Sequence, residues 1–137
     1  MRAGQEIASI TVSGTEYLTL SDFKRFDDGS GYVATLVASA GGFECRPRSF
    51  YFDSLDSFIA QLRTAYQSLS GRVEFGNPYE PDHLSFTFGP HGHIVLSGDL
   101  GRADASQCRL MFSLRFDQTY IGSFLDQLEK VSRALHG

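Results

Sequence analysis

The 137-residue sequence has no tryptophan, only two cysteines and four prolines, and no excess of positive charge. Its 12 basic residues are outnumbered by 16 acidic ones, which gives a formal net charge of -4. Proteins that bind nucleic acid through its phosphates need a basic face, so this balance argues against a nucleic-acid partner. The cysteines, Cys45 and Cys108, form neither a metal-ligand spacing nor a disulfide framework, and we expect both to be reduced in strands.

Long apolar runs are also absent. The longest stretch without Asp, Glu, Lys or Arg runs from His83 to Gly98, and Ser, Gly, Pro and His interrupt it. A membrane-spanning helix needs about 20 mostly apolar residues. The first ten residues lack the cationic stretch and apolar core of a secretory signal. We therefore expect a cytoplasmic protein that does not contact a membrane.

The composition is that of an ordinary globular protein, with 42% apolar and 20% charged residues and with 12 phenylalanines. A chain of this length is typical of one domain, here residues 1–137, with enough apolar side chains for one core.

Apolar and polar residues alternate along most of the chain, which indicates strands with one face on a core. In one such segment Leu110, Phe112, Leu114 and Phe116 are the apolar members. Pro47 places its strand at a sheet edge or at a bulge, because proline cannot donate to a ladder. The predicted strands are residues 6–12, 16–26, 31–39, 43–52, 84–88, 93–98 and 110–116.

Two other segments have apolar residues at steps of three and four, the spacing of one helical face. The first runs from Leu55 to Leu69, and either Asp53 or Ser54 can cap its start, with Gly71 as its stop signal. The second covers 124–135, and its cap is either Asp117 or Thr119.

Both helical segments fit the pattern F-[IL]-x-Q-L-x6-L-x-G, with an offset of 66 residues. An internal duplication with halves 1–71 and 72–137 would explain this match, and so would helix periodicity with similar capping. In either case the chain predicts strands followed by a helix, twice. We expect an α+β fold with an antiparallel sheet of about eight strands and two helices against its apolar face.

No residue pattern predicts catalysis, a metal or a cofactor. His91 and His93 would need a third ligand, for which His83 or Asp99 is available, but histidine is also simply tolerated at a hairpin tip. The serines lack the G-x-S-x-G frame of a nucleophile elbow. Carboxylates such as Asp117 are explained by capping at helix starts.

Two pairs of arginines could form an anion-binding patch, one pair flanking Pro47 and the other on the polar side of a later strand. Solvated strand faces commonly carry arginine, and this is the interpretation that we favour. These residues are Arg46, Arg48, Arg109 and Arg115.

The segment 77–82 is a better candidate for a binding surface. Its two prolines restrict the backbone, and it presents Tyr79, Glu80 and Asp82. Rigid aromatic side chains lose little entropy on docking and are favoured at protein interfaces. Weaker candidates for contacts lie on other loops, namely Asp27, Asp28, Asp99 and Asp104.

Three segments resemble the WapI-type immunity proteins of bacterial polymorphic-toxin systems. They are Leu69 to Glu74 leading into Tyr79-Glu80, then Gly92 to Gly98, and then Phe116 to Ile121 with its short motif Asp117-Gln118-Thr119-Tyr120. The resemblance covers residues 43–137, and within it we interpret Gly71, Gly98 and Asp117 as turn and cap positions.

The resemblance implies a non-enzymatic cytosolic antitoxin that binds and neutralises a cognate toxin domain. Two alternatives follow from the residues themselves. One is a small-ligand-binding module with a phenylalanine-lined cavity between sheet and helices. The other is an enzyme with a site assembled from scattered polar residues. The sequence leaves the oligomeric state open.

Overall fold

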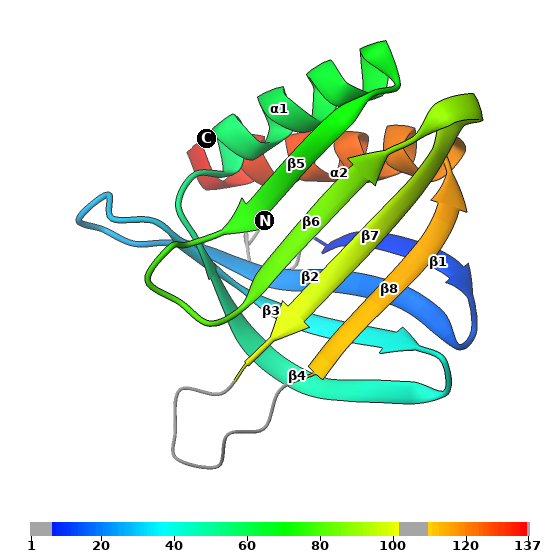
Figure 1. Ribbon diagram of the computed structural model, residues 1–137. Coiled ribbons are helices and arrows are strands. Elements are labelled where there is room, and N and C mark those ends of the chain that lie inside the picture. Colours follow the sequence, from blue (N-terminus) through cyan, green and yellow to red (C-terminus); the bar gives the residue numbers. More distant parts are fainter. Residues whose placement is uncertain (1–6, 102–109, 137) are drawn as a thin grey trace.

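The computed structural model of the chain (Figure 1) describes residues 7–101 and 110–136. This part of the chain holds eight strands, two α-helices and a short 3-10 turn. The first half contains β1 (Ile7–Ser13), β2 (Glu16–Arg25), β3 (Tyr32–Ala40), β4 (Phe43–Phe52) and α1 (Leu55–Ser68). The second half contains β5 (Gly71–Gly76), β6 (His83–Phe88), the turn Pro90–Gly92, β7 (His93–Leu100), β8 (Leu110–Asp117) and α2 (Thr119–His136).

The strands form two four-stranded antiparallel sheets, in the orders β1-β2-β3-β4 (sheet A) and β5-β6-β7-β8 (sheet B). The predicted α+β class is confirmed, and strands followed by a helix occur twice. The eight strands are divided between two sheets, and α1 connects β4, the last strand of sheet A, to β5, the first strand of sheet B. Strand β5 was not predicted, since only Val73 and Phe75 alternate within its six residues.

Pro47 lies where the prediction placed it. Strand β4 is an edge of sheet A, and its register against β3 shifts between the pairs Leu36↔Arg48 and Ala38↔Cys45. Two residues of β4 therefore stand opposite one residue of β3, which is a β-bulge. The missing amide hydrogen of Pro47 costs no ladder bond there.

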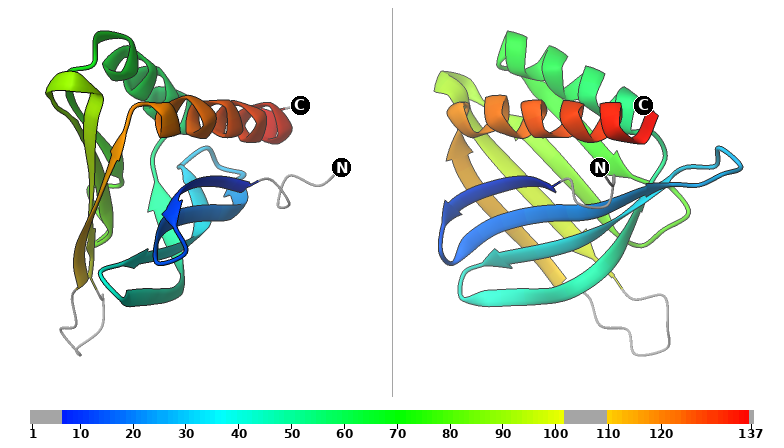
Figure 2. Two further views of the ribbon diagram at one scale, coloured as in Figure 1. Left: turned by 90° about the vertical axis from the view of Figure 1, so that its right-hand side faces the viewer. Right: turned by 180° about the vertical axis from the view of Figure 1, so that it is seen from behind.

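Each helix packs mainly on the sheet of the other half. Helix α1 lies along β5, the first strand of sheet B, whereas α2 contacts β1, the first strand of sheet A. The two helices also contact each other, and Figure 2 shows both on the same side of sheet B.

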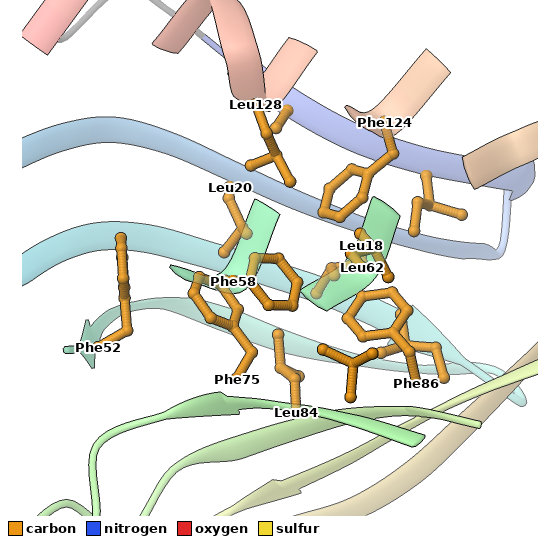
Figure 3. Packing of buried hydrophobic residues seen from close by; sticks show 14 of the residues in the cluster. Leu18, Leu20, Phe52, Phe58, Leu62, Phe75, Leu84, Phe86, Phe124 and Leu128 are labelled. Carbon is orange, nitrogen blue, oxygen red and sulfur yellow. The ribbon is translucent and has the colours of Figure 1, made fainter. Parts of the chain in front are cut away.

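One continuous hydrophobic cluster contains residues from all of the sheets and helices. Phenylalanine rings link its parts (Figure 3). Phe58 of α1 stacks on Phe75 of β5 with 3.8 Å between ring centroids, and Phe86 contacts both Phe58 and Phe124 of α2. Burying such rings supplies most of the stabilising free energy of a core.

The helix ends agree with the sequence only in part. Ser54, and not Asp53, caps α1, because its side chain accepts a hydrogen bond from the Ser57 amide. The left-handed residue at the end of α1 is Leu69, with φ 52°, so the prediction of Gly71 as the helix stop was wrong. At α2, Asp117 accepts a hydrogen bond from the Thr119 amide, which settles the choice left open by the sequence.

Two glycines are required by close packing. A β-carbon on Gly98 would lie 2.1 Å from the ring of Phe112, its partner across the β7–β8 pair. A β-carbon on Gly92 would lie 2.9 Å from the side-chain oxygen of Gln118. The family-like segments 92–98 and 116–121 are therefore packed against each other.

Candidate partner-binding surface

The turn between β2 and β3 projects from one end of sheet A (Figure 1). The Phe26 amide donates to the Gly31 carbonyl at 2.9 Å, and the Ser30 amide donates to the Asp28 carboxylate at 2.9 Å. Hydrogen bonds from the Ser30 side chain and amide lower the pKa of Asp28, so its carboxylate is ionised at neutral pH. Asp27 and Asp28 are both exposed on this ordered turn.

Two aromatic side chains support the same turn. The rings of Phe26 and Tyr51 stack with centroids 6.3 Å apart and an angle of 21° between their planes, and both are more than a third exposed. Neither residue was predicted from the sequence to be a contact. The sequence does place Phe26 directly before the predicted turn 27–30, and it places Tyr51 on the polar side of the alternation in β4. These two positions could have indicated exposed aromatic side chains.

The loop between β5 and β6, residues 77–82, is held by its first residue. The Asn77 side chain accepts a hydrogen bond from the Tyr79 amide at 2.8 Å, and the Asn77 carbonyl accepts one from the Glu80 amide at 3.0 Å. Tyr79 is 91% exposed, and Glu80 is half-buried. The loop therefore presents an aromatic ring and a carboxylate on an ordered backbone.

Both loops start from one seam between the sheets. A β-carbon on Gly31 would lie 2.8 Å from the Phe52 carbonyl oxygen, so only glycine fits at the root of the turn. The Asp53 amide donates to the carbonyl of Gly76 at 3.3 Å, which joins the end of β4 to the root of the second loop. Figures 1 and 2 show both loops at this end of the molecule. We call residues 26–31 and 77–82 together the loop end.

Asp82 has a different setting from the other predicted contacts. It is 4% exposed, and its carboxylate accepts two hydrogen bonds from Arg48 of β4, at 2.7 Å and 2.9 Å. Arg48 also donates to the Gly101 carbonyl. We call Arg48, Asp82 and Gly101 the inter-sheet clamp. Burial leaves Asp82 no surface for a partner in this arrangement.

The two remaining candidates do not belong to the loop end. Asp99 lies on the outer face of sheet B, opposite His83 and Met111 in the neighbouring strands. It lines an open hollow of about 750 Å³ with the row Ser85, Ser97 and Ser113. Asp104 lies outside the described residues.

The arginines predicted to occupy solvated strand faces are dispersed. Arg48 belongs to the inter-sheet clamp, where it pairs with Asp82. Arg115 lines a surface hollow with His93 and Asp117. Arg109 and the side chain of Arg46 lie outside the described part. His91 sits in the 3-10 turn with φ 61°, and His93 opens β7.

The space between sheets and helices is filled by side chains (Figure 3), with Phe50, Phe52, Phe86 and Phe124 each at most 1% exposed. The phenylalanines form the core that the sequence predicts. Of three described hollows, one lies on the outer face of sheet B, one between the β3–β4 turn and β8, and one between α1 and β5. Cys45 is a buried free thiol whose pKa is raised by desolvation, and Cys108 lies outside the described residues.

In the described ranges 7–101 and 110–136, no three His, Cys, Asp or Glu side chains are grouped to hold a metal ion. Neither of the two α-helices in these ranges is long and apolar enough to cross a membrane.

The model of the WapI-like immunity protein family matches residues 2–135, nearly the whole chain. The chain belongs to this family. The resemblance seen in residues 43–137 is confirmed and extends through the first half of this WapI-like chain. A search of curated proteins gives no match.

One solved structure similar to this chain comes from the crystal structures of Trypanosoma bruciei MRP1/MRP2. It is 18% identical, has a TM-score of 0.50, and the alignment covers 92% of this chain and 77% of that one. At this level of identity the similarity concerns the fold alone: the arrangement of sheets and helices recurs in a distant protein.

Proposed function

We propose that this protein is a non-enzymatic immunity protein, which binds and neutralises a cognate bacterial toxin domain in the cytoplasm of the cell that makes both. Membership of the WapI-like immunity protein family over residues 2–135 is the observation that carries the proposal. The family supports an immunity role, and the cognate toxin of a polymorphic-toxin system is the partner that we propose for it.

The loop end is the surface that we propose for the contact. Tyr79 and Glu80 on one loop, with Asp27 and Asp28 on the other, are the contact residues that we favour. Asp99 and Asp104 stay weaker candidates. Asp82 is buried against Arg48, so we do not propose that it contacts the toxin. Ordered loops lose little conformational entropy on binding, and an exposed tyrosine is a typical hot-spot residue.

The acidic side chains of the loop end favour a toxin with a basic surface. Opposite fields increase the rate of encounter and disfavour wrong partners. Neutralisation then follows from occlusion, because a rigid body seated on the toxin blocks access to its active site. The alternative of a small-ligand module has less support, because aromatic side chains fill the space where its cavity was expected.

Co-expression provides the test. The probe is the product of the neighbouring gene, with its C-terminal domain expressed alone where that product is a long secreted protein. We expect a stoichiometric complex on co-purification, and growth of cells that the toxin domain alone would kill. If no complex forms and co-expression gives no protection, the proposal is wrong.

Charge-neutral variants test the surface separately. We expect D27N/D28N combined with Y79A to weaken the complex at least tenfold, with a smaller dependence of the association rate on salt. E16Q is the matched control, because Glu16 is an exposed carboxylate at the opposite end of β2. Equal affinity of both variants would remove the loop end from the interface.

A further inference from the structure

We propose that Arg48 and Asp82 are positioning residues, which set the backbone of loop 77–82 in the shape that the partner recognises. This inference rests on the proposed function, because it concerns the same surface. It gives Asp82 a role in binding that requires no contact with the toxin.

The contact between Arg48 and Asp82 joins the two sheets at the base of the loop. Arg48 belongs to β4 of sheet A, and Asp82 is the last loop residue before β6 of sheet B. The Nε and Nη2 atoms of Arg48 donate to the two carboxylate oxygens at 2.7 Å and 2.9 Å. A guanidinium held by two parallel bonds fixes direction as well as distance.

Gly101 adds a third segment to the clamp. Its carbonyl accepts from Arg48 Nη2 at 2.5 Å, and its amide donates to the Asp82 carboxylate at 3.0 Å. A β-carbon on Gly101 would lie 3.0 Å from the side chain of Pro81. The end of β7 is thus packed against the last two residues of the loop.

A second set of hydrogen bonds holds the first residues of the loop. Asn77 binds the amides of Tyr79 and Glu80, and the carbonyl of Gly76 binds the Asp53 amide. Both ends of the loop are therefore attached to sheet A or to β7, while Tyr79 between them stays exposed. These hydrogen bonds hold the backbone on both sides of Tyr79.

Stability alone is a weak explanation for the clamp. In this ion pair the Asp82 side chain is 6% exposed and the Arg48 side chain is 30% exposed. Such a pair adds little net stability, because desolvation of the carboxylate offsets much of the attraction, and apolar replacements are often tolerated. Specifying one conformation is a better-supported use of such a pair. A preformed loop binds more tightly because less ordering is required in the complex.

Amide hydrogen exchange of the free protein is the first measurement. We expect D82N to increase exchange at Tyr79, Glu80 and Gly101 at least tenfold, while core amides such as that of Leu62 stay protected. The double variant R48M/D82L removes both charges and retains an apolar contact, so it separates positioning from stability. We expect it to melt near the wild-type temperature but to exchange rapidly at the same three amides.

Affinity for the toxin domain is the second measurement. We expect a loss of at least tenfold in both clamp variants and none in E74Q. Glu74 is the matched control, because it forms an exposed ion pair with Arg72 on the strand that leads into the loop. Unchanged exchange in both clamp variants overturns the inference, and so does unchanged affinity in R48M/D82L.

The two proposals fail in different ways. If the wild-type protein does not bind the toxin domain, the proposed function fails, and the exchange data still decide whether the clamp orders the loop. If the wild type binds but a clamp variant loses affinity with normal exchange, Asp82 acts by direct contact and positioning is wrong.

Discussion

The two halves of the molecule repeat one topology, but the corresponding glutamines of their helices form different hydrogen bonds. The five buried residues of α1 and the five of α2 correspond one to one at an offset of 66 positions. The glutamines of the shared pattern do not correspond in their contacts. Gln127 of α2 accepts a hydrogen bond from the Ser9 amide of edge strand β1 at 2.7 Å, whereas Gln61 of α1 donates to Ser57 within its own helix.

A groove of about 390 Å³ runs between α1 and β5, and Gln61 and Arg72 are among the residues that line it. The buried positions of the two helices correspond, whereas the hydrogen bonds of their glutamines differ. The comparison suggests that repetition of a core does not imply repetition of a surface.

Separation of the two halves should have the most severe effect on folding. We expect fragments 1–71 and 72–137 each to be unfolded alone, because α1 packs on β5 of the other half and α2 on β1. Circular dichroism and amide exchange of each fragment check this, with an equimolar mixture as the control. A fragment with cooperative unfolding would show that the halves are independent domains.

Truncation of the paired helix phenylalanines tests whether the two cores are equivalent. Phe58 and Phe124 are 2% and 0% exposed, so F58A and F124A should each lower the free energy of unfolding by about 3–5 kcal/mol. Urea denaturation measures both, and exposed S123A is the control. Values that differ by more than about 2 kcal/mol, roughly the width of that range, would contradict equivalence.

The sequence predicted the fold where periodicity is strong and missed it where a pattern is short. Alternation identified seven strands, and the 3.6-residue period identified both helices. Strand β5 offered only Val73 and Phe75, and Leu69 in the left-handed region has no residue-type signal. Of the predicted contact residues, Tyr79 is exposed as expected, but the burial of Asp82 depends on Arg48, 34 residues away. No local pattern predicts such a pairing.

The two glutamines of the shared pattern should contribute unequally to stability. Q127A leaves the half-buried Ser9 amide without its acceptor, so we expect a loss of about 1–2 kcal/mol in unfolding free energy. Q61A removes a hydrogen bond on the exposed face of α1 and should lower the free energy of unfolding by less than about 0.5 kcal/mol. Thermal denaturation measures both variants. Equal losses of unfolding free energy would show that the hydrogen bond of Gln127 to β1 stabilises the fold no more than the bond of Gln61 within α1.

The caps of the two helices should differ in how their contribution to stability depends on pH. Hydrogen bonds from the Thr119 side chain and amide lower the pKa of Asp117 from 3.8, whereas α1 is capped by Ser54, which does not titrate. A carboxyl group with a lowered pKa in the folded state stabilises the fold above its unfolded pKa, and that contribution is lost as pH falls through the folded value. The stability of D117N should therefore fall less steeply than that of the wild type below about pH 4, where the unfolded carboxyl group begins to bind its proton. S54A should lower stability equally at all pH values, and parallel pH profiles for D117N and the wild type would assign the cap of α2 to uncharged hydrogen bonding alone.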